Sequence, residues 1–171
     1  MPGRRHVAVF AAAMAAAAAL AAGCGFQLQR PPRLALQSLY LAGFDTRSPM
    51  AGELRRQLLG TPGLKLTDSP AEAEAVLQAL DDARDQLVAG ATATGQVREL
   101  TLRSRLRFVV RSATGTELVA ETQLEQSRSM STTETTALAK EQEAALLFRS
   151  MEKDIAAQVV RRLATLPRPG A

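Results

Sequence analysis

Cysteine and histidine, the residues that most often act as nucleophile, general base or zinc ligand, each occur once in this chain of 171 residues. They are Cys24 and His6, so nothing after Cys24 offers a Cys/His set for zinc or a histidine-based catalytic triad. No pair of acidic residues stands out as a general acid and base. We therefore predict a protein that is not an enzyme and that needs no metal and no cofactor.

The beginning of the chain has the composition of an export signal. Arg4 and Arg5 make a basic start, and residues 7–22 are an uncharged, alanine-rich apolar run. A transmembrane anchor is the alternative, but a spanning helix needs about 20 strongly apolar residues. We predict that residues 1–23 are a signal peptide and are removed, and His6 would leave with them.

Cys24 has the surroundings of a lipid attachment site. Ala21, Ala22 and Gly23 come directly before it, and this run of small residues resembles the lipobox of bacterial lipoproteins. In a lipobox the peptidase cuts before the cysteine, and the thiol carries the lipid. Gly25 follows the cysteine, where an aspartate would signal retention in the inner membrane. We predict a palmitoylated lipoprotein, anchored through Cys24 to the periplasmic face of the outer membrane; an incidental cysteine in a cleaved signal is the alternative.

The rest of the chain has the length and charge of one ordinary domain. The formal charge of +4 falls to about +2 without Arg4 and Arg5, so bulk polyanion binding is not implied. Aromatic residues make up 4% of the chain, which is too few for stacking on bases, and we predict no nucleic-acid partner. The predicted parts after the signal peptide are a lipidated tether at 24–35, a single α+β domain at 36–166, and a frayed tail at 167–171.

Short strands and one helix are predicted in the first half of the domain. Ser48 is a suitable N-cap, Pro49 fits the first helical position, and Gly60 follows the end of the helix. The apolar face of this helix consists of Met50, Leu54 and Leu58. Strands are predicted at residues 38–42, 64–67, 73–80 and 85–91, the last of them turning at 93–96 into the next strand. The segment 73–80 also suits a helix, and we favour a strand.

The clearest strand pattern runs from residue 99 to residue 111. Apolar residues alternate there with a row of arginines, so that one face is apolar and the other is basic. Residues 117–127 repeat the alternation with glutamates on the polar face, and Gly115 suits the turn between the two strands.

The register of this hairpin follows from its apolar residues. Both apolar sets occupy even positions, so opposed residues must sum to an even number, which puts Ser112 opposite Thr116. The cross-strand charge pairs predicted by this register are Arg111 with Glu117, Arg107 with Glu121 and Arg103 with Glu125. Arg105 is left without a partner and is therefore the better ligand candidate. A polyanion site along the whole arginine row is the alternative.

The last part of the domain is predicted to be one long helix from residue 137 to Leu166. Its apolar residues step by three or four, and this stripe consists of Ala144, Phe148, Met151, Ile155, Val159 and Leu163. We interpret the stripe as core; a ligand groove lined by Phe148 and Met151 is the alternative. The residues predicted to lie off the stripe are Arg149, Glu152, Lys153 and Arg161.

In chain order, the predicted elements are a strand, a helix, several strands and a long helix. Both helices have one apolar face, and the strongest strand pair does as well. The sequence therefore predicts an α+β fold, a two-layer sandwich in which a mixed or antiparallel sheet of about four strands carries two helices on one face.

Five short stretches resemble the lipopolysaccharide-assembly lipoprotein family, LptE, in their order and spacing. They are CGFQL at 24–28, RELTL at 98–102, ALAKE at 137–141, KD at 153–154 and RRL at 161–163. The resemblance implies an outer-membrane lipoprotein that sits as plug and scaffold in the lumen of the LptD β-barrel. It would assist lipopolysaccharide transport and assembly at the cell surface by binding, without catalysis.

The resemblance also implies contact with lipopolysaccharide, whose phosphates suit Lys and Arg side chains. Lys140 matches the family's basic position at the start of the last helix; a solvated helix lysine is the alternative. Relatives can carry a basic residue near the turn glycine of the first long hairpin, where this chain has only Ala and Thr around Gly95. Arg98 or Arg84 would substitute there. The candidate lipopolysaccharide contacts are Lys140, Arg105 and Arg98.

A second function stays open at this point. An auxiliary lipoprotein of an ABC-type envelope transport system would have a similar anchor and a similar compact domain. A hydrolase of envelope polymers is a third possibility, for which the sequence offers no motif. The membrane protein that co-purifies with the chain would separate these functions.

Overall fold

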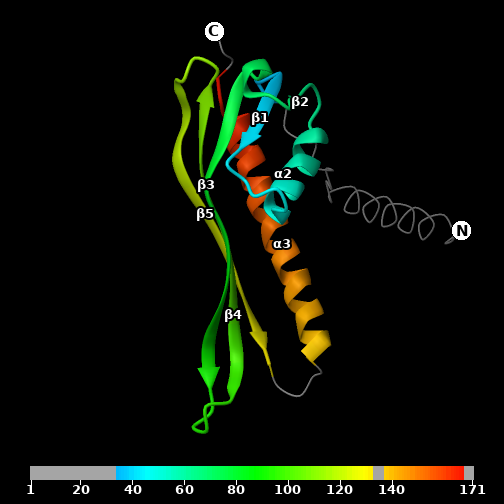
Figure 1. Cartoon of the computed structure of the whole chain (residues 1–171), viewed down its shortest axis with the longest axis vertical. Coiled ribbons are helices and arrows are strands. Elements are labelled where there is room, and N and C mark those ends of the chain that lie inside the picture. Colours follow the sequence, from blue (N-terminus) through cyan, green and yellow to red (C-terminus); the bar gives the residue numbers. More distant parts are fainter. Residues whose placement is uncertain (1–33, 133–136, 168–171) are drawn as a thin grey trace, which may run out of the picture. The chain divides into compact units, whose positions relative to one another are not determined.

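Long strands and a long helix dominate the computed structural model, which describes residues 34–132 and 137–167 (Figure 1). The long elements are β3 (Ala75–Ala91), β4 (Val97–Ser112), β5 (Glu117–Ser131) and α3 (Ala137–Ala164). The short ones are β1 (Ser38–Ala42), α2 (Pro49–Leu59), β2 (Lys65–Leu66) and the 3-10 turn η1 (Pro70–Glu72). The predicted signal peptide and Cys24 lie outside the described residues.

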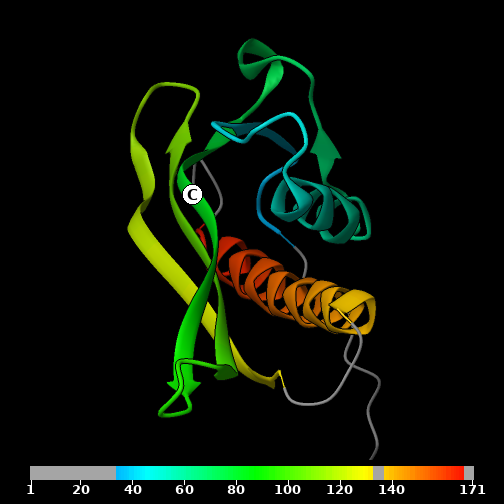
Figure 2. The ribbon, with the colours of Figure 1, turned by 60° about the horizontal axis from the view of Figure 1, so that its bottom comes forward.

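The strands form a single mixed sheet within the described residues, in the order β2-β1-β3-β4-β5. β1 is parallel to both of its neighbours, whereas β3, β4 and β5 run antiparallel to one another. Helices α2 and α3 lie on the same side of the sheet (Figures 1 and 2). The predicted α+β fold with two helices on one face is confirmed. The described sheet has five strands rather than about four, because the short β2 adds an edge beside Ser38 and Leu39.

The strands predicted at 73–80 and 85–91 are one continuous strand, β3. A bulge between Ala79 and Asp81 shifts its register against β4 and exchanges its two faces. Leu77 and Ala79 are buried before the bulge, and Arg84 is directed to the helix side after it. Asp81 and Asp82 follow the bulge and remain inside the strand.

The turn between β4 and β5 has the predicted register. The Ser112 amide donates to the Thr116 carbonyl at 2.8 Å, and Gly115 has a φ of 85°. Beyond the turn the pairing shifts twice, so that Arg105 lies opposite Glu125. The predicted opposition of Arg107 to Glu121 and of Arg103 to Glu125 is therefore wrong. Each shift moves the pairing by one residue, so after two shifts the numbers of opposed residues again add up to an even number. The apolar faces of both strands therefore still point to the helices.

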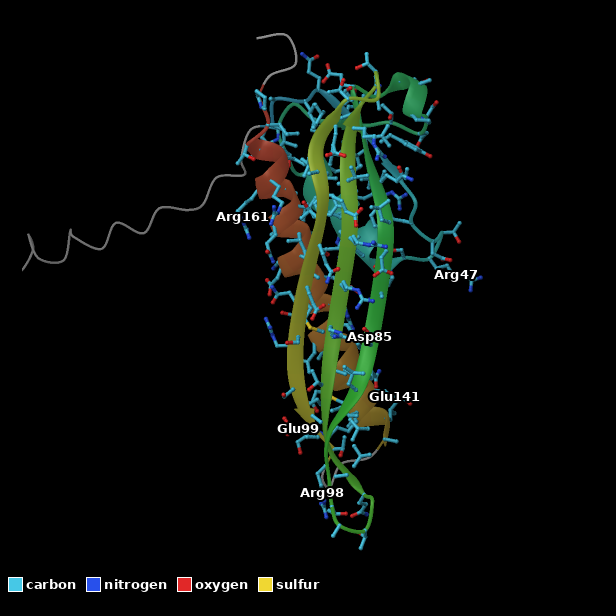
Figure 3. The ribbon with its side chains drawn as sticks, turned by 90° about the vertical axis from the view of Figure 1, so that its left-hand side faces the viewer. Arg47, Asp85, Arg98, Glu99, Glu141 and Arg161 are labelled. Carbon is cyan, nitrogen blue, oxygen red and sulfur yellow. The ribbon has the colours of Figure 1, made fainter. Side chains whose placement is uncertain are left out.

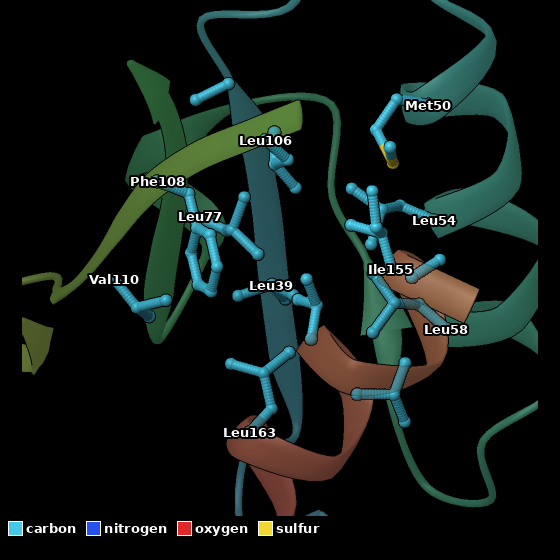
Figure 4. Close-up of a cluster of buried hydrophobic side chains, with 14 of the residues drawn as sticks. Leu39, Met50, Leu54, Leu58, Leu77, Leu106, Phe108, Val110, Ile155 and Leu163 are labelled. Atoms are coloured by element: carbon cyan, nitrogen blue, oxygen red, sulfur yellow. The ribbon is translucent and has the colours of Figure 1, made fainter. Parts of the chain in front are cut away.

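The main hydrophobic core lies between the two helices and the sheet (Figure 4). Both predicted helix stripes point into it, with Leu54 and Leu58 from α2 and Ile155 and Leu163 from α3. Ser48 caps α2 as predicted, since its Oγ accepts the Ala51 amide at 2.9 Å. Within the described part of the chain, no helix is long and apolar enough to cross a membrane.

A second, smaller cluster lies further along the sheet. Its buried members are Leu102, Met130, Ala144, Phe148 and Met151. The first residues of the α3 stripe belong to this cluster and the later ones to the main core. Phe148 and Met151 are therefore packed side chains, and the core interpretation of the stripe is confirmed.

Candidate functional site

Two of the predicted ligand residues, Arg98 and Lys140, lie toward the same end of the domain. We define the hairpin end as the turn at residues 92–96 with the adjoining Val97 and Arg98. Thr132, which follows β5, donates its backbone amide to the Arg98 carbonyl at 3.0 Å and its hydroxyl to Val97. Helix α3 begins five positions later and carries Lys140 in its first turn. Figure 3 shows Arg98 and Glu141, the neighbour of Lys140, toward this end.

The two cations at this end differ in how freely they can bind an anion. Arg98 is exposed, and its side chain donates a 3.3 Å hydrogen bond to the Gln96 side chain. Lys140 donates to Glu143 at 2.9 Å, one turn along the helix. Such a pair on a helix contributes only about 0.2–0.5 kcal/mol, so a phosphate can replace Glu143. Both side chains can therefore make charge-assisted hydrogen bonds to a phosphate.

Large apolar side chains are also exposed on the strands next to the hairpin end and on the first part of α3. They are Leu87, Val88, Val97, Leu138 and Leu146. Exposed aliphatic groups next to cations are suited to a ligand that has both acyl chains and phosphates.

Arg105 is not the unpaired arginine of β4. Its Nε donates to Asp81 at 2.8 Å, its Nη1 lies 3.7 Å from Asp85, and Glu125 lies opposite on β5. The hydrogen bond that Arg105 donates to Asp81 raises the pKa of the Arg105 guanidinium above its ordinary value. Arg105 is on the sheet face opposite the helices, so the structure does not bring it together with Lys140. The strand patterns alone do not reveal Asp81 and Asp85 as partners, because these residues come from β3, whose alignment depends on the bulge.

Arginines and carboxylates alternate over this helix-free side of the sheet, which we call the outer face (Figure 3). The arginine row is a charge network there, as the ladder interpretation predicted. Two of its ion pairs are diagonal, Arg107 with Glu121 at 3.1 Å and Arg103 with Glu125 at 3.9 Å. Arg103 also pairs with Asp85 of β3 at 3.1 Å. The network therefore spans three strands instead of the predicted two.

Glu152 is buried, contrary to the prediction that it lies off the α3 stripe. It is 2% exposed and binds the Arg84 guanidinium, which lies 5.1 Å from the centre of the Phe148 ring. The signal was in the sequence, because residue 152 is four positions after Phe148 and three before Ile155. Burial raises the pKa of Glu152, and the hydrogen bond from Arg84 opposes that shift. Arg84 is thus bound to α3 and does not substitute at the hairpin turn.

Comparison with family models decides the family. The model of LptE, described as lipopolysaccharide-assembly, matches residues 36–163. The chain belongs to the LptE family. The family is one of lipopolysaccharide-assembly lipoproteins. The comparison with curated proteins gave no significant match.

Solved lipoproteins have the same fold as this LptE-family chain. Uncharacterized lipoprotein B from Nitrosomonas europaea has a TM-score of 0.68 at 23% identity, over 82% of this chain and 90% of its own. Rare lipoprotein B from Shewanella oneidensis has a TM-score of 0.63 at 25% identity, over 75% and 94%. A minor lipoprotein from Acinetobacter baumannii has a TM-score of 0.64 at 21% identity, over 81% and 99%.

Proposed function

We propose that this LptE-family protein is an outer-membrane lipoprotein that plugs and scaffolds an LptD-type β-barrel from inside its lumen, and that it binds lipopolysaccharide there. The observation that carries the proposal is the family match over residues 36–163, almost the whole predicted domain. The anchor would be lipid on Cys24 after removal of residues 1–23. The stretch from Cys24 to Leu36 can extend over about 40 Å, enough to connect the membrane surface with a domain in a barrel.

The outer face supports a place inside a barrel lumen. The lumen of an outer-membrane barrel is polar, so a plug needs a polar surface. On the outer face Arg103, Arg105 and Arg107 each have a carboxylate within 4.0 Å. Because the positive and negative charges are paired, the outer face is polar but nearly neutral. Such a surface can contact lumen side chains of either charge.

The hairpin end supports lipopolysaccharide binding. Arg98 and Lys140 can each donate a hydrogen bond to a phosphate oxygen, and the exposed aliphatic side chains on the neighbouring strands and helix can contact acyl chains. Arg105 remains a weaker candidate, because a ligand would have to displace Asp81 from its guanidinium.

The barrel role is tested in cells by affinity capture of the full-length lipoprotein. We expect an LptD-type barrel to co-purify with the chain, and we expect a Cys24→Ser variant to lose its membrane anchor. Stable expression of the chain with capture of an inner-membrane transporter instead would contradict the proposal. Normal assembly of the barrel in cells that lack this protein would contradict it as well.

Lipopolysaccharide binding is tested with purified protein and purified lipopolysaccharide. We expect Arg98→Ala and Lys140→Ala each to weaken binding about tenfold, the size of one lost charge-assisted hydrogen bond. Arg149→Ala is the matched control, since this α3 cation is exposed and donates to the Ala145 carbonyl of its own helix. Unchanged affinity in both test variants, or an equal loss in the control, would reject the hairpin end as the site.

A further inference from the structure

A row of polar side chains crosses the helix-facing side of the sheet. Arg84 of β3 lies opposite Ser104 of β4, and Ser104 lies opposite Gln126 of β5. Glu152 reaches the same level from α3, because it binds Arg84. We call these four residues the polar belt. On β4, the belt interrupts an apolar alternation at Ser104, the buried position between Leu102 and Leu106.

The polar belt separates the two hydrophobic clusters. On β4, Leu102 belongs to the small cluster and Leu106 to the main core. On α3, Met151 belongs to the small cluster and Ile155 to the main core, with Glu152 between them. The polar belt thus marks the boundary between the main core and the small cluster, both on the sheet and on α3.

The polar belt is held mainly by one ion pair. Both Nε and Nη2 of Arg84 approach the same Glu152 oxygen, and the Glu152 side chain is 3% exposed. The Ser104 hydroxyl is buried without a hydrogen-bond partner among the described residues. A buried polar group that lacks a partner weakens the packing around it. The contact between β3 and α3 at this level therefore depends on Arg84, which binds Glu152 and lies 5.1 Å from the centre of the Phe148 ring.

The two sides of the polar belt are unequal in stability. Among the described residues, the main core has seventeen buried hydrophobic members and the small cluster five. Regions with little buried apolar surface open locally at lower free energy than the whole domain unfolds. The side with the small cluster includes the hairpin end and the first half of α3.

We propose that the Arg84–Glu152 pair is a latch that holds the first half of α3 against the β3–β4 hairpin, and that the part beyond the polar belt opens as a separate unit when Arg84 is lost and Glu152 stays buried as an unpaired carboxylate. The latch rests on the structure alone. Its consequence for ligand binding rests on the proposed function, because Arg98 is on the hairpin and Lys140 is on the helix. Opening of this part would let the hairpin and the helix move apart without any contact between the pair and the ligand, so Arg84 and Glu152 are positioning residues.

Amide hydrogen exchange of the full chain, read by peptide, tests the latch. Arg84→Met leaves the Glu152 carboxylate buried without its cation, and we expect exchange to rise at least about tenfold in residues 97–103 and 140–150. Residues 50–58 and 155–163 in the main core should change far less. The double variant Arg84→Met/Glu152→Gln removes the buried charge as well and should return most of the protection. If the single variant does not fold, Arg84→Lys carries the test: one ammonium replaces the two guanidinium contacts to Glu152, and we expect a smaller rise in exchange that is again confined to residues 97–103 and 140–150.

The matched control is a second ion pair between sheet and helix. Arg128 of β5 pairs with Asp154 of α3 at 3.3 Å, with side chains 41% and 50% exposed. Arg128→Ala should raise exchange less than about threefold, because an exposed pair contributes little. An equal rise on both sides of the polar belt in Arg84→Met, no rise at all, or the same rise in Arg128→Ala would overturn the latch.

Lipopolysaccharide affinity tests the positioning role. We expect Arg84→Met to weaken binding several-fold, the double variant to restore it, and Arg128→Ala to leave it unchanged. Loss of affinity that the double variant does not restore would overturn the positioning role. If Arg98→Ala and Lys140→Ala have no effect on affinity, the proposed binding site fails, while the exchange experiment still decides the latch.

Discussion

Gly43 follows β1 with a φ of 78°, and its Cα lies against the backbone of Ala79, where β3 bulges. A Cβ at this position would overlap with the Ala79 carbonyl oxygen. Gly63 provides a matched control, because its φ is 85° and a Cβ there would meet nothing within 4 Å. Alanine at the two positions thus has the same backbone cost, and the variants differ only in the clash.

The size of each effect follows from these two terms. A side chain at positive φ costs about 1–2 kcal/mol, and the smaller entropy of the unfolded Ala chain returns about 0.4–1 kcal/mol. Gly63→Ala should therefore lose about 0.5–1 kcal/mol. Gly43→Ala must also displace backbone between β1 and β3, and overpacking of this kind costs about 1–3 kcal/mol more.

Urea and thermal unfolding of the purified variants, followed by circular dichroism, measure both losses. For a domain of this length, 1 kcal/mol corresponds to about 3–5 °C in Tm. We expect Gly43→Ala to lower Tm by about 6–15 °C and Gly63→Ala by a few degrees. Equal losses in the two variants would refute the argument, since they would mean that contact with Ala79 contributes nothing beyond the cost of positive φ.

Three further predictions concern the core, the outer face and the polar belt. Phe108→Ala should lose about 3–5 kcal/mol in urea unfolding, because the ring is fully buried in the main core; a loss below 1 kcal/mol would contradict that packing. Glu121→Lys should lower stability by up to about 1 kcal/mol by replacing the Arg107 ion pair with a like-charge contact, and an unchanged Tm would count against this pairing. Burial raises the pKa of Glu152 above 4.5, so the folded state binds its proton more strongly than the unfolded chain does. The stability that this group contributes is present at low pH and is lost as the pH rises from about 4.5 through the raised pKa. Glu152→Gln should remove that loss. A difference in unfolding free energy between wild type and variant that stays constant with pH would refute the assignment.

Local patterns predicted much of this fold. Ser48 and Pro49 begin α2 as expected, because a cap and a fixed φ act within one turn of the chain. The α3 stripe and the β4 alternation report which face of each element is apolar, and both faces are buried as predicted. Gly115 marks the hairpin turn because its backbone conformation is costly for any other residue. The family followed from the order of such stretches, and the family match over residues 36–163 agrees.

Tertiary structure decided the partners of the charged residues. The bulge in β3 brings Asp81 to Arg105, and no pattern within either strand reveals that shift. Two shifts in the β4–β5 pairing keep the apolar parity, so the sequence could predict the face but not which residue is opposed to which. Glu152 lies at a core position by its spacing, but only packing against Arg84 makes a buried carboxylate acceptable there. Periodicity reports the direction of a side chain, whereas the identity of its neighbour depends on contacts between segments far apart in the sequence.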